Sequence, residues 1–550
     1  MMRRPVRRWV IGLLVLGAFG CKQRPSPPPP PPPVAAPLAA VASDAGPAPR
    51  DVSVSAATDA TRAPDGSRLV GMAGDAGPAP RTVSGSVAGA AGATRAPDGS
   101  RLVGMAGDAG PAPRDVPVSA AADVTLSPEE SRLVGLAGDT AAAMADIRGL
   151  RLLREVRRGV MDRDAIVARL RQKTAREYPP GEIVLEGELY KRLGLLPEAM
   201  DYERTMFDLL EEQVAGFYDP DEQTLYIAGW LPAAAQPGTM AHELTHALQD
   251  QHFHIGRYTH HVRGNGDAQT AAMAVIEGDA TAAMMDFSLR PLGRRVQDLP
   301  DVTAMVASQI ESSDQVRMRA APRALRETLL FPYLAGLTMC SRALREGDGY
   351  SRVDALLARP PASTEQVLHA DKLSAREAPV VVPVKVPPAL AEGFEVAYHD
   401  VLGELGARLF FYGSMPDERA HAAAQGWGGD HAVLLVPRGS MTSAGDAGVN
   451  LSANALPRDV LLWTVALDPV AGAQGAAADA EAVDFAEAAA AVLARRHGAR
   501  PAVTIAGAAA ARDVGGGRVS LVARSGRRVL VAERVPRAAA AAVVRSALEE

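Results

Sequence analysis

A long stretch at residues 22–126 sets the first limit on what this 550-residue chain can fold into. It contains no Phe, Tyr or Trp, and it holds 18 of the 42 prolines, seven of them in the unbroken run Pro27–Pro33. A proline run of this kind adopts a stiff polyproline II rod. Because large apolar side chains are few, burial cannot offset the entropy of ordering this stretch. We therefore predict that residues 22–126 are a disordered or extended tether.

Two short segments recur within the tether and at its end. DAGPAPR begins at Asp44, Asp75 and Asp108, and SRLVG begins at Ser67, Ser100 and Ser131. The last SRLVG copy is preceded by Ser127-Pro-Glu-Glu130, which has the form of a helix capping box. The earlier copies have Ala-Pro-Asp-Gly at this place, which is typical of a turn. We infer that the tether grew by duplication of a domain edge and that the fold starts near Ser127.

The N-terminus has the features of an export signal. Four arginines precede residue 9, and the apolar run Trp9–Gly20 then ends at Cys21. The run is too short to span a bilayer, which needs about 20 residues, but it suits a signal-peptide core. It resembles a bacterial lipoprotein signal, which implies that residues 1–20 are removed and that Cys21 is lipidated. The chain would then be anchored in the cell envelope, on the periplasmic or surface side of an outer membrane. With an ordinary cleaved signal it would instead be secreted.

Charge and cysteine content exclude two classes of protein. The chain has 58 Lys and Arg against 64 Asp and Glu, a net charge of −6, which argues against a nucleic-acid binder. Two cysteines cannot build a disulfide framework. If Cys21 carries a lipid, Cys340 is left without a partner, and we expect it to be a small buried apolar side chain.

The segment after Ser127 reads as mostly helical. Apolar residues recur at three- and four-residue spacing over Asp162–Arg176, Leu185–Leu195 and Tyr202–Val214. The following segment, Gly216–Ile227, has aromatic and aliphatic residues on both sides of an Asp-Pro-Asp turn, and it predicts a β-hairpin.

A helix that begins near Pro237 carries the sequence His242-Glu243-Leu-Thr-His246. Residues four apart lie on one face of a helix, so both imidazoles can bind the same metal ion. Glu243 follows the first histidine and can reach a metal-bound water as a general base. The uncharged flanking residues favour this interpretation over a solvated surface helix.

This motif resembles that of the HExxH zinc metallopeptidases. The resemblance implies a thermolysin-like, zincin-type catalytic domain, a Zn2+ cofactor, a peptide or protein substrate, and an edge strand that holds the substrate. The predicted hairpin ending at Ile227 lies where that edge strand belongs in the chain.

Two residues compete for the place of third metal ligand. His252 has the spacing of the HExxHxxGxxH subclass, but Gln249 stands where that subclass has its helix-breaking glycine. If the helix continues, His252 points about 80° away from His242. Glu277 lies in a second predicted helix, from about Asp267 to Phe287, within a Glu-Gly-x-Ala segment similar to that of the gluzincins. We therefore predict Glu277 as the ligand.

The residues that would surround the metal are less well defined by sequence. One turn after Glu277 stands Thr281, where gluzincins often have an acidic group, and Asp279 is expected on the opposite helix face. We expect His369 as oxyanion donor, with Tyr333 as the alternative. The remaining nearby histidines are expected to line a loop beside the metal: His252, His254, His260 and His261.

The C-terminal part predicts an α+β accessory domain. An extended connection, Val380–Pro388, precedes segments that read as strands or apolar stretches: Phe394–Phe411, Ala432–Pro437, Leu461–Leu467, Arg518–Ala523 and Arg528–Val535. Asp484–Arg496 and Ala538–Glu549 read as Ala-rich helices, and Gly426–Asp430 reads as a tight corner.

These observations combine into one hypothesis. We expect an α+β protein with a mainly helical catalytic domain at 127–378 and an accessory domain at 379–550, tethered through 21–126 to a membrane. Its predicted activity is zinc-dependent hydrolysis of peptide bonds in envelope or extracellular polypeptides. The alternative is a cell-surface binding or scaffold lipoprotein on a peptidase fold, without catalysis.

Overall fold

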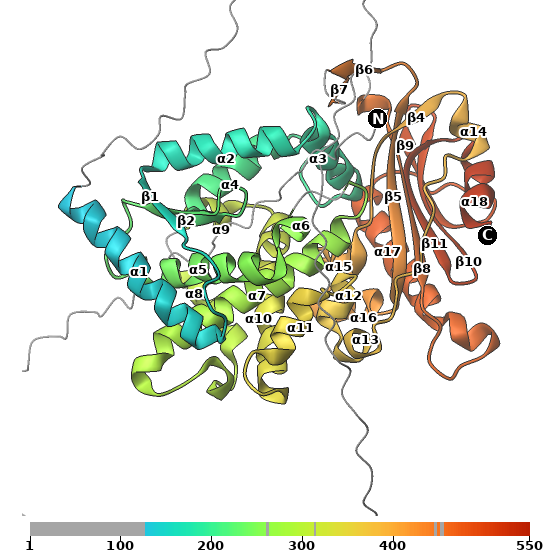
Figure 1. The fold of residues 1–550 in the computed structure, drawn as a ribbon. Helices are drawn as coiled ribbons and strands as arrows, with labels where there is room; N and C mark the ends of the chain where they lie inside the picture. The colour runs from blue at the N-terminus through green and yellow to red at the C-terminus, as the bar shows by residue number, and fades with distance from the viewer. Residues whose placement is uncertain (1–126, 260–262, 313–314, 445–447, 452–455, 550) are drawn as a thin grey trace, which may run out of the picture. The chain divides into compact units, whose positions relative to one another are not determined.

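The computed structural model describes residues 127–549 except 260–262, 313–314, 445–447 and 452–455. The described residues form an α+β fold in which helices predominate (Figure 1), as predicted, and their contacts group them into one compact unit. The predicted signal peptide, Cys21 and the tether lie outside the described residues. Of the helices described, none has both the length and the apolar composition needed to cross a membrane.

The first described helix, α1 (Pro128–Arg148), starts with the predicted capping box. The Ser127 hydroxyl accepts from the Glu130 amide at 3.2 Å, and the Ser127 amide donates to the Glu130 carboxylate at 2.8 Å. These two bonds satisfy amide groups that would otherwise lack partners at the start of the helix. Gly149 follows the last residue of the helix as its C-cap, and its φ of 67° lies in the left-handed region that glycine favours.

Three helices and a small sheet follow. Helices α2 (Arg163–Glu177), α3 (Glu182–Leu193) and α4 (Tyr202–Gln213) confirm the three predicted helices to within a few residues. Strands β2 (Gly216–Asp219) and β3 (Thr224–Ala228) form the predicted antiparallel hairpin. The other edge of β3 pairs in parallel with β1 (Arg157–Met161), which the sequence had not indicated. The order β1-β3-β2 leaves β2 at an edge of the sheet.

Three long helices form the centre of the helical part: α5 (Gln236–Phe253), α7 (Gly266–Leu289) and α10 (Arg323–Glu346) (Figure 1). Helix α7 is buried on all sides, which explains its Ala- and Met-rich sequence. It crosses α10 where Gly278 and Gly336 face each other, and a Cβ atom on either glycine would overlap the other helix. The crossing therefore depends on the absence of side chains at these two positions.

The remaining helices of this part are short. They are α6 (Gly256–Thr259), η1 (Arg290–Leu292), η2 (Val296–Asp298), α8 (Val302–Ser312), α9 (Val316–Ala320), α11 (Ser351–Ala358), α12 (Thr364–Leu368) and α13 (Ala370–Ala375). Cys340 of α10 is buried in the hydrophobic core, as expected for a small apolar side chain.

Replacing Gly278 with Ala should lower the free energy of unfolding by about 1–3 kcal/mol, because the added methyl group must push α10 away from α7. Gly135, exposed in α1 with open space around it, provides a matched control. Gly135→Ala should be neutral or stabilise by up to about 1 kcal/mol through helix propensity. Denaturant unfolding of both variants measures this. Equal stability of the two variants would contradict a close-packed crossing.

The C-terminal part is built on a six-stranded antiparallel sheet in the order β4-β5-β8-β11-β10-β9 (Figure 1). Its strands are β4 (Phe394–Asp400), β5 (Trp427–Pro437), β8 (Val460–Leu467), β9 (Ala508–Gly515), β10 (Arg518–Ser525) and β11 (Arg528–Pro536). Strands β6 (Met441–Ala444) and β7 (Gly448–Leu451) form a separate hairpin. The helices are α14 (Pro388–Ala391), α15 (Gly403–Phe411), α16 (Asp417–Ala424), η3 (Leu456–Arg458), η4 (Gly475–Asp479), α17 (Ala480–His497) and α18 (Ala540–Leu548).

The two faces of the sheet bury alternate residues of each strand. In β5, Leu434 belongs to the core beneath α3, α15, α16 and α17, whereas Leu435 belongs to the core beneath α14 and α18. The segment Phe394–Phe411, read as a strand or apolar stretch, is strand β4 followed by helix α15, which starts at Gly403. The prediction of a tight corner at Gly426–Asp430 is wrong, because β5 starts at Trp427. Strand β9 was not predicted.

Helix α3 is fixed to the sheet through one face, although it comes early in the chain. Its Leu189 packs in the sheet core, and its buried Arg192 binds Asp459 at 2.7 Å and Glu198 at 2.6 Å. The opposite face of α3 is therefore held in place toward α7. The predicted boundary between residues 378 and 379 falls in the extended segment before α14.

Candidate metal centre

Three buried side chains from two helices meet in the middle of the helical part. His242 and His246 lie one turn apart on α5, and Glu277 faces them from α7. The Glu277 Oε2 atom is 3.1 Å from His242 Nε2 and 3.6 Å from His246 Nε2. One ligand atom from each residue lies within 4.8 Å of the others, so the group could hold a metal ion. The predicted residue Glu277 is thus the one that joins the histidine pair.

The charges of these groups depend on one another. Burial lowers the pKa of His242 to about 4. Burial also acts against protonation of His246, but the adjacent Glu277 carboxylate outweighs it and raises the pKa of His246 to about 9. Burial opposes ionisation of Glu277 as well, yet the two imidazoles lower its pKa to about 2. The carboxylate is therefore ionised, and positive charge is favoured between these three side chains.

Gln249 determines which nitrogen of His246 faces Glu277. The Gln249 Nε2 group donates to the Ile276 carbonyl at 2.9 Å and to Asp279 Oδ2 at 2.7 Å. Both of these partners can only accept, so the Oε1 atom must face His246 Nδ1, which is 2.9 Å away. His246 Nδ1 therefore carries a proton, and Nε2 is the nitrogen that can bind a metal once it gives up its own proton. His242 Nδ1, by contrast, has no hydrogen-bond partner within the described part of the chain.

The chain of contacts continues from Gln249 to the end of α1. Asp279 forms a fully buried ion pair with Arg148, whose Nε lies 2.9 Å from Asp279 Oδ1. Arg148 also binds Asp354 at 2.7 Å and stacks on the ring of Tyr350, 4.2 Å from its centre. Asp279 does point away from the face of Glu277, as predicted. It nevertheless contacts a candidate metal ligand, His246, through Gln249.

Gln249→Leu should weaken binding of a divalent transition metal about 10- to 100-fold, because His246 loses the bond that sets its tautomer and orientation. Gln251→Leu is the matched control, since Gln251 is equally buried on α5 but its amide bonds the backbone of Leu153 and Arg154. Titration with a metal indicator should show no loss of affinity in the control. An equal loss in both variants would mean that Gln249 acts through general stability.

Glu243 lies beside the cluster and bonds the edge strand. Its Oε2 atom accepts a hydrogen bond from the Tyr218 amide of β2 at 2.8 Å. Burial raises the pKa of Glu243 to about 7, so a modest change in its surroundings can move a proton on or off this carboxylate. The contact also means that one main-chain donor on the outer edge of β2 already has a partner.

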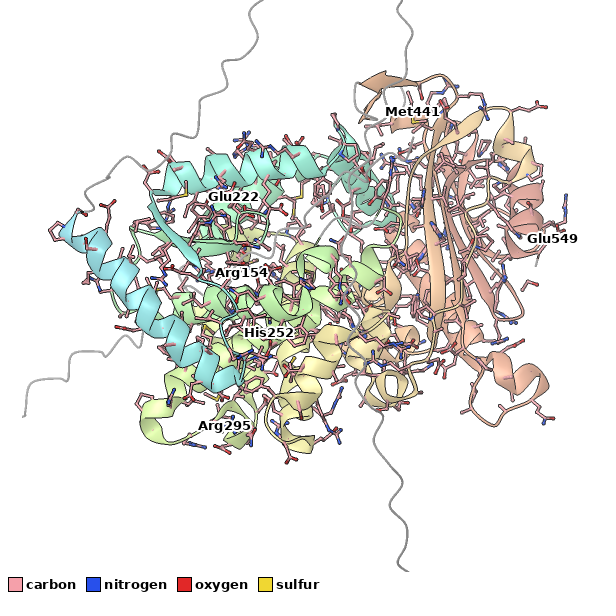
Figure 2. All side chains as sticks on the ribbon, in the orientation of Figure 1. Arg154, Glu222, His252, Arg295, Met441 and Glu549 are labelled. Carbon is pink, nitrogen blue, oxygen red and sulfur yellow. The ribbon has the colours of Figure 1, made fainter. Side chains whose placement is uncertain are left out.

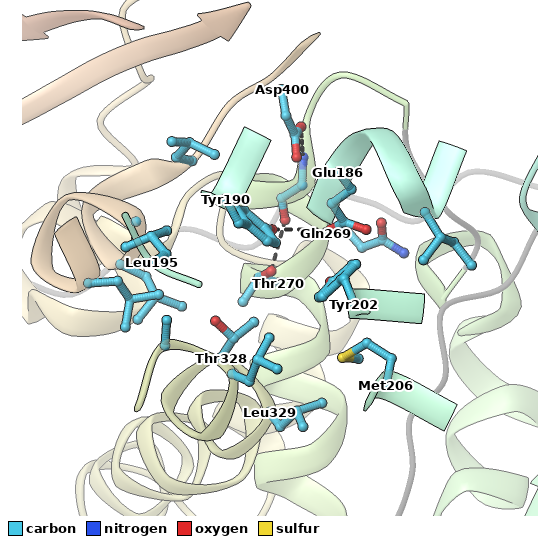
Figure 3. Close-up of a pocket in the computed structure, with 18 of the residues that line it drawn as sticks. Glu186, Tyr190, Leu195, Tyr202, Met206, Gln269, Thr270, Thr328, Leu329 and Asp400 are labelled. Carbon is cyan, nitrogen blue, oxygen red and sulfur yellow. Dashed lines mark hydrogen bonds between the residues drawn. The ribbon is translucent and has the colours of Figure 1, made fainter. Parts of the chain in front are cut away.

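Tyr333 of α10 also lies beside the cluster. Its ring stacks on that of His242 with 6.3 Å between ring centres. Burial, followed by the charge of Glu277, raises the pKa of the Tyr333 hydroxyl well above its usual value, so it stays protonated. Tyr333 and Glu277 both line a cavity of about 230 Å³, and Figure 3 shows other residues of its wall. The Gly278–Gly336 crossing brings Tyr333 to this position.

The other candidate histidines lie elsewhere. His252 Nε2 is 2.8 Å from the Arg151 carbonyl, and helix α5 continues through His252, which Figure 2 labels, to Phe253. His369 is bound to Glu404 of α15 at 2.8 Å and is not among the residues that line the cavity. Its contacts lend no support to the oxyanion role, which stays a prediction. His260 and His261 lie outside the described residues.

Sequence reasoning identified the three ligand candidates and Glu243, but it missed Gln249 and Arg148. Gln249 had been noted only as a missing glycine, although its position three residues after His246 places it on the same helix face. No known protein family, curated protein or solved structure matches the chain.

Proposed function

We propose that the protein is a zinc-dependent metallopeptidase that hydrolyses peptide bonds in envelope or extracellular polypeptides. The observation that carries the proposal is the convergence of His242, His246 and Glu277 within 4.8 Å, with the Glu243 carboxylate next to them on α5. The HExxH pattern and the carboxylate from a following helix agree with a gluzincin-like site.

The donor set favours zinc over other common divalent ions. Two imidazole nitrogens and one carboxylate oxygen are a known ligand set of catalytic zinc, which keeps its fourth position for water or substrate. Magnesium and calcium prefer oxygen ligands throughout. The fixed tautomer of His246 and the ionised state of Glu277 suit a cation between them.

The residues around the cluster have complementary tasks in peptide hydrolysis. When bound, zinc lowers the pKa of a water molecule and polarises the peptide carbonyl. Glu243, with a pKa of about 7, accepts the proton of the attacking water and then passes it to the leaving amine. The Tyr333 hydroxyl, which is protonated and bonds Glu277, would exchange that bond to donate a hydrogen bond to the oxygen that gains negative charge.

The cellular setting follows from the N-terminal sequence. We propose that lipidation at Cys21 anchors the chain to a membrane of the cell envelope. Residues 22–126 would then act as a spacer that lets the folded part reach polypeptide substrates away from the membrane.

The test is cleavage of a broad peptide library by the purified mature chain, read by mass spectrometry. We expect cleavage to stop after chelation and to return when one equivalent of zinc is added. If the protein binds zinc but cleaves no member of the library, a non-catalytic binding lipoprotein becomes the better interpretation.

A further inference from the structure

Two loops of the helical part display leucine side chains to solvent. The first loop, residues 149–156, joins α1 to β1 and contains Leu152 and Leu153, and the second, residues 290–295, follows α7 and contains Leu292. These side chains are 36%, 52% and 71% exposed, and they are the only exposed leucines among the side chains that the structure describes. Large apolar side chains that gather on one part of a surface mark an interaction site, whereas scattered ones do not.

The two leucine loops leave the fold next to each other. Arg290, two residues before Leu292, binds Asp146 of α1 at 2.7 Å. Asp146 lies three residues before Gly149, where the first leucine loop begins. The helices from which the loops leave, α1 and α7, also pack against each other. The exposed leucines of both loops therefore lie in one region of the surface.

The main chain of the first leucine loop is held by the end of α5. Gln251 accepts hydrogen bonds from the amides of Leu153 at 2.7 Å and Arg154 at 3.2 Å, and it donates to the Arg154 carbonyl at 3.0 Å. The Arg151 carbonyl lies 2.8 Å from His252 Nε2. Because these bonds use backbone groups of the loop, its conformation does not require that the leucine side chains be buried.

The charged residues of the leucine loops are mostly basic. Besides Glu155, they are five exposed arginines: Arg151, Arg154, Arg290, Arg294 and Arg295. Three of the arginines pair with Asp146, Asp250 or Asp286, but Arg151 and Arg294 form no ion pair within the described part of the chain. The whole chain has a net charge of −6, so the leucine loops differ in charge from the rest of the protein.

We propose that the two leucine loops form a docking surface for an anionic lipid bilayer. The leucines enter the headgroup region, and the arginines bind lipid phosphates with their planar donor groups. A surface of this size binds weakly by itself. The proposed lipid anchor at Cys21 would raise its effective concentration at the membrane, so weak docking is sufficient.

Docking would also orient the metal centre. Gln251, which holds the first leucine loop, lies five residues after His246 on α5, a distance of about 7.5 Å along the helix. The C-terminal end of α5 would therefore point toward the bilayer. The candidate metal ligands would be held close to the membrane surface.

The test measures how strongly the mature chain binds lipid vesicles when its anchor is removed by Cys21→Ser. Vesicles of phosphatidylcholine alone are compared by sedimentation with vesicles that also contain phosphatidylglycerol. We expect the protein to bind the anionic vesicles at least about fivefold more strongly. Added salt should weaken this binding, because it screens exposed charges.

The contribution of the leucines is measured with Leu153→Ser/Leu292→Ser. This double variant should lower the partition coefficient on anionic vesicles on the order of tenfold, since two apolar side chains no longer leave water. The matched control is Val381→Ser/Val384→Ser, which changes two exposed apolar residues in the segment before α14. The control should bind like the parent protein.

The contribution of the arginines is measured with Arg151→Gln/Arg294→Gln. Losing two charges near the lipid surface should also lower the partition coefficient on the order of tenfold. The matched control, Arg495→Gln/Arg500→Gln, removes two exposed arginines at the end of α17 and just beyond it. It makes the same change in net charge and should leave vesicle binding unchanged.

All four double variants should keep the thermal unfolding midpoint of the parent, because the changed side chains are exposed. Equal binding to neutral and anionic vesicles overturns the proposal, and so does a loss in a control that equals the loss in its matched variant. Binding that falls only in the arginine variant would show a purely electrostatic contact and overturn the insertion of the leucines. None of these measurements needs peptide cleavage, so failure of the peptidase proposal would leave membrane docking intact.

Discussion

Replacing Glu243 with Gln is expected to lower kcat/KM for peptide cleavage by about 10²- to 10⁴-fold while the protein stays folded and keeps its zinc. The amide has the shape of the carboxylate and retains an oxygen that can accept from the Tyr218 amide. It cannot take up the proton of the attacking water. Because burial already disfavours the charged form of Glu243, the neutral amide should not destabilise the helix core.

Three measurements on the Glu243→Gln protein separate catalysis from structure. Zinc content by elemental analysis and the thermal unfolding midpoint should match the parent protein, and only peptide cleavage should fall. Cleavage within a few-fold of the parent would exclude Glu243 as the general base. Loss of zinc together with cleavage would instead show that Glu243 contributes to metal binding.

Glu277→Ala should weaken zinc binding by more than about 100-fold, beyond the loss expected for a residue outside the ligand set. The substitution removes the carboxylate within 3.6 Å of both imidazoles and leaves two ligands of the described cluster. A zinc titration against a competing indicator measures the change. Glu277→Gln should show a similar loss of zinc affinity, because the neutral amide keeps the volume of the side chain but binds zinc poorly. A loss in this variant would therefore come from the missing ligand and not from altered packing.

His252→Ala is the matched control for this experiment. His252 has the spacing of an alternative third ligand, but its ring bonds the Arg151 carbonyl instead. We expect zinc affinity to be unchanged in His252→Ala. If His252→Ala loses zinc and Glu277→Ala retains it, the proposed ligand set is wrong.

The helices and the hairpin could be predicted because their signals are local. The Ser127 capping box, the three- and four-residue spacing in α2 to α4 and the Asp-Pro-Asp turn between β2 and β3 each specify an element within a few residues. For Phe394–Phe411 the sequence indicated only a strand or an apolar stretch, because a continuous apolar run suits a buried strand and a buried helix equally well. There the chain changes from strand to helix at Gly403, whose φ is 72°.

The sequence by itself determined that His242 and His246 share a helix face, because helical periodicity alone requires it. It also singled out Glu277, through the Glu-Gly-x-Ala segment that is similar to that of the gluzincins. Only the tertiary structure decided the contacts that orient the site. The link from His246 through Gln249 and Asp279 to Arg148 joins residues as far apart as 131 positions. The cavity that Glu277 and Tyr333 line likewise depends on how α3 packs between the sheet and α7. Such contacts depend on how whole elements pack, and no local spacing in the chain records that packing.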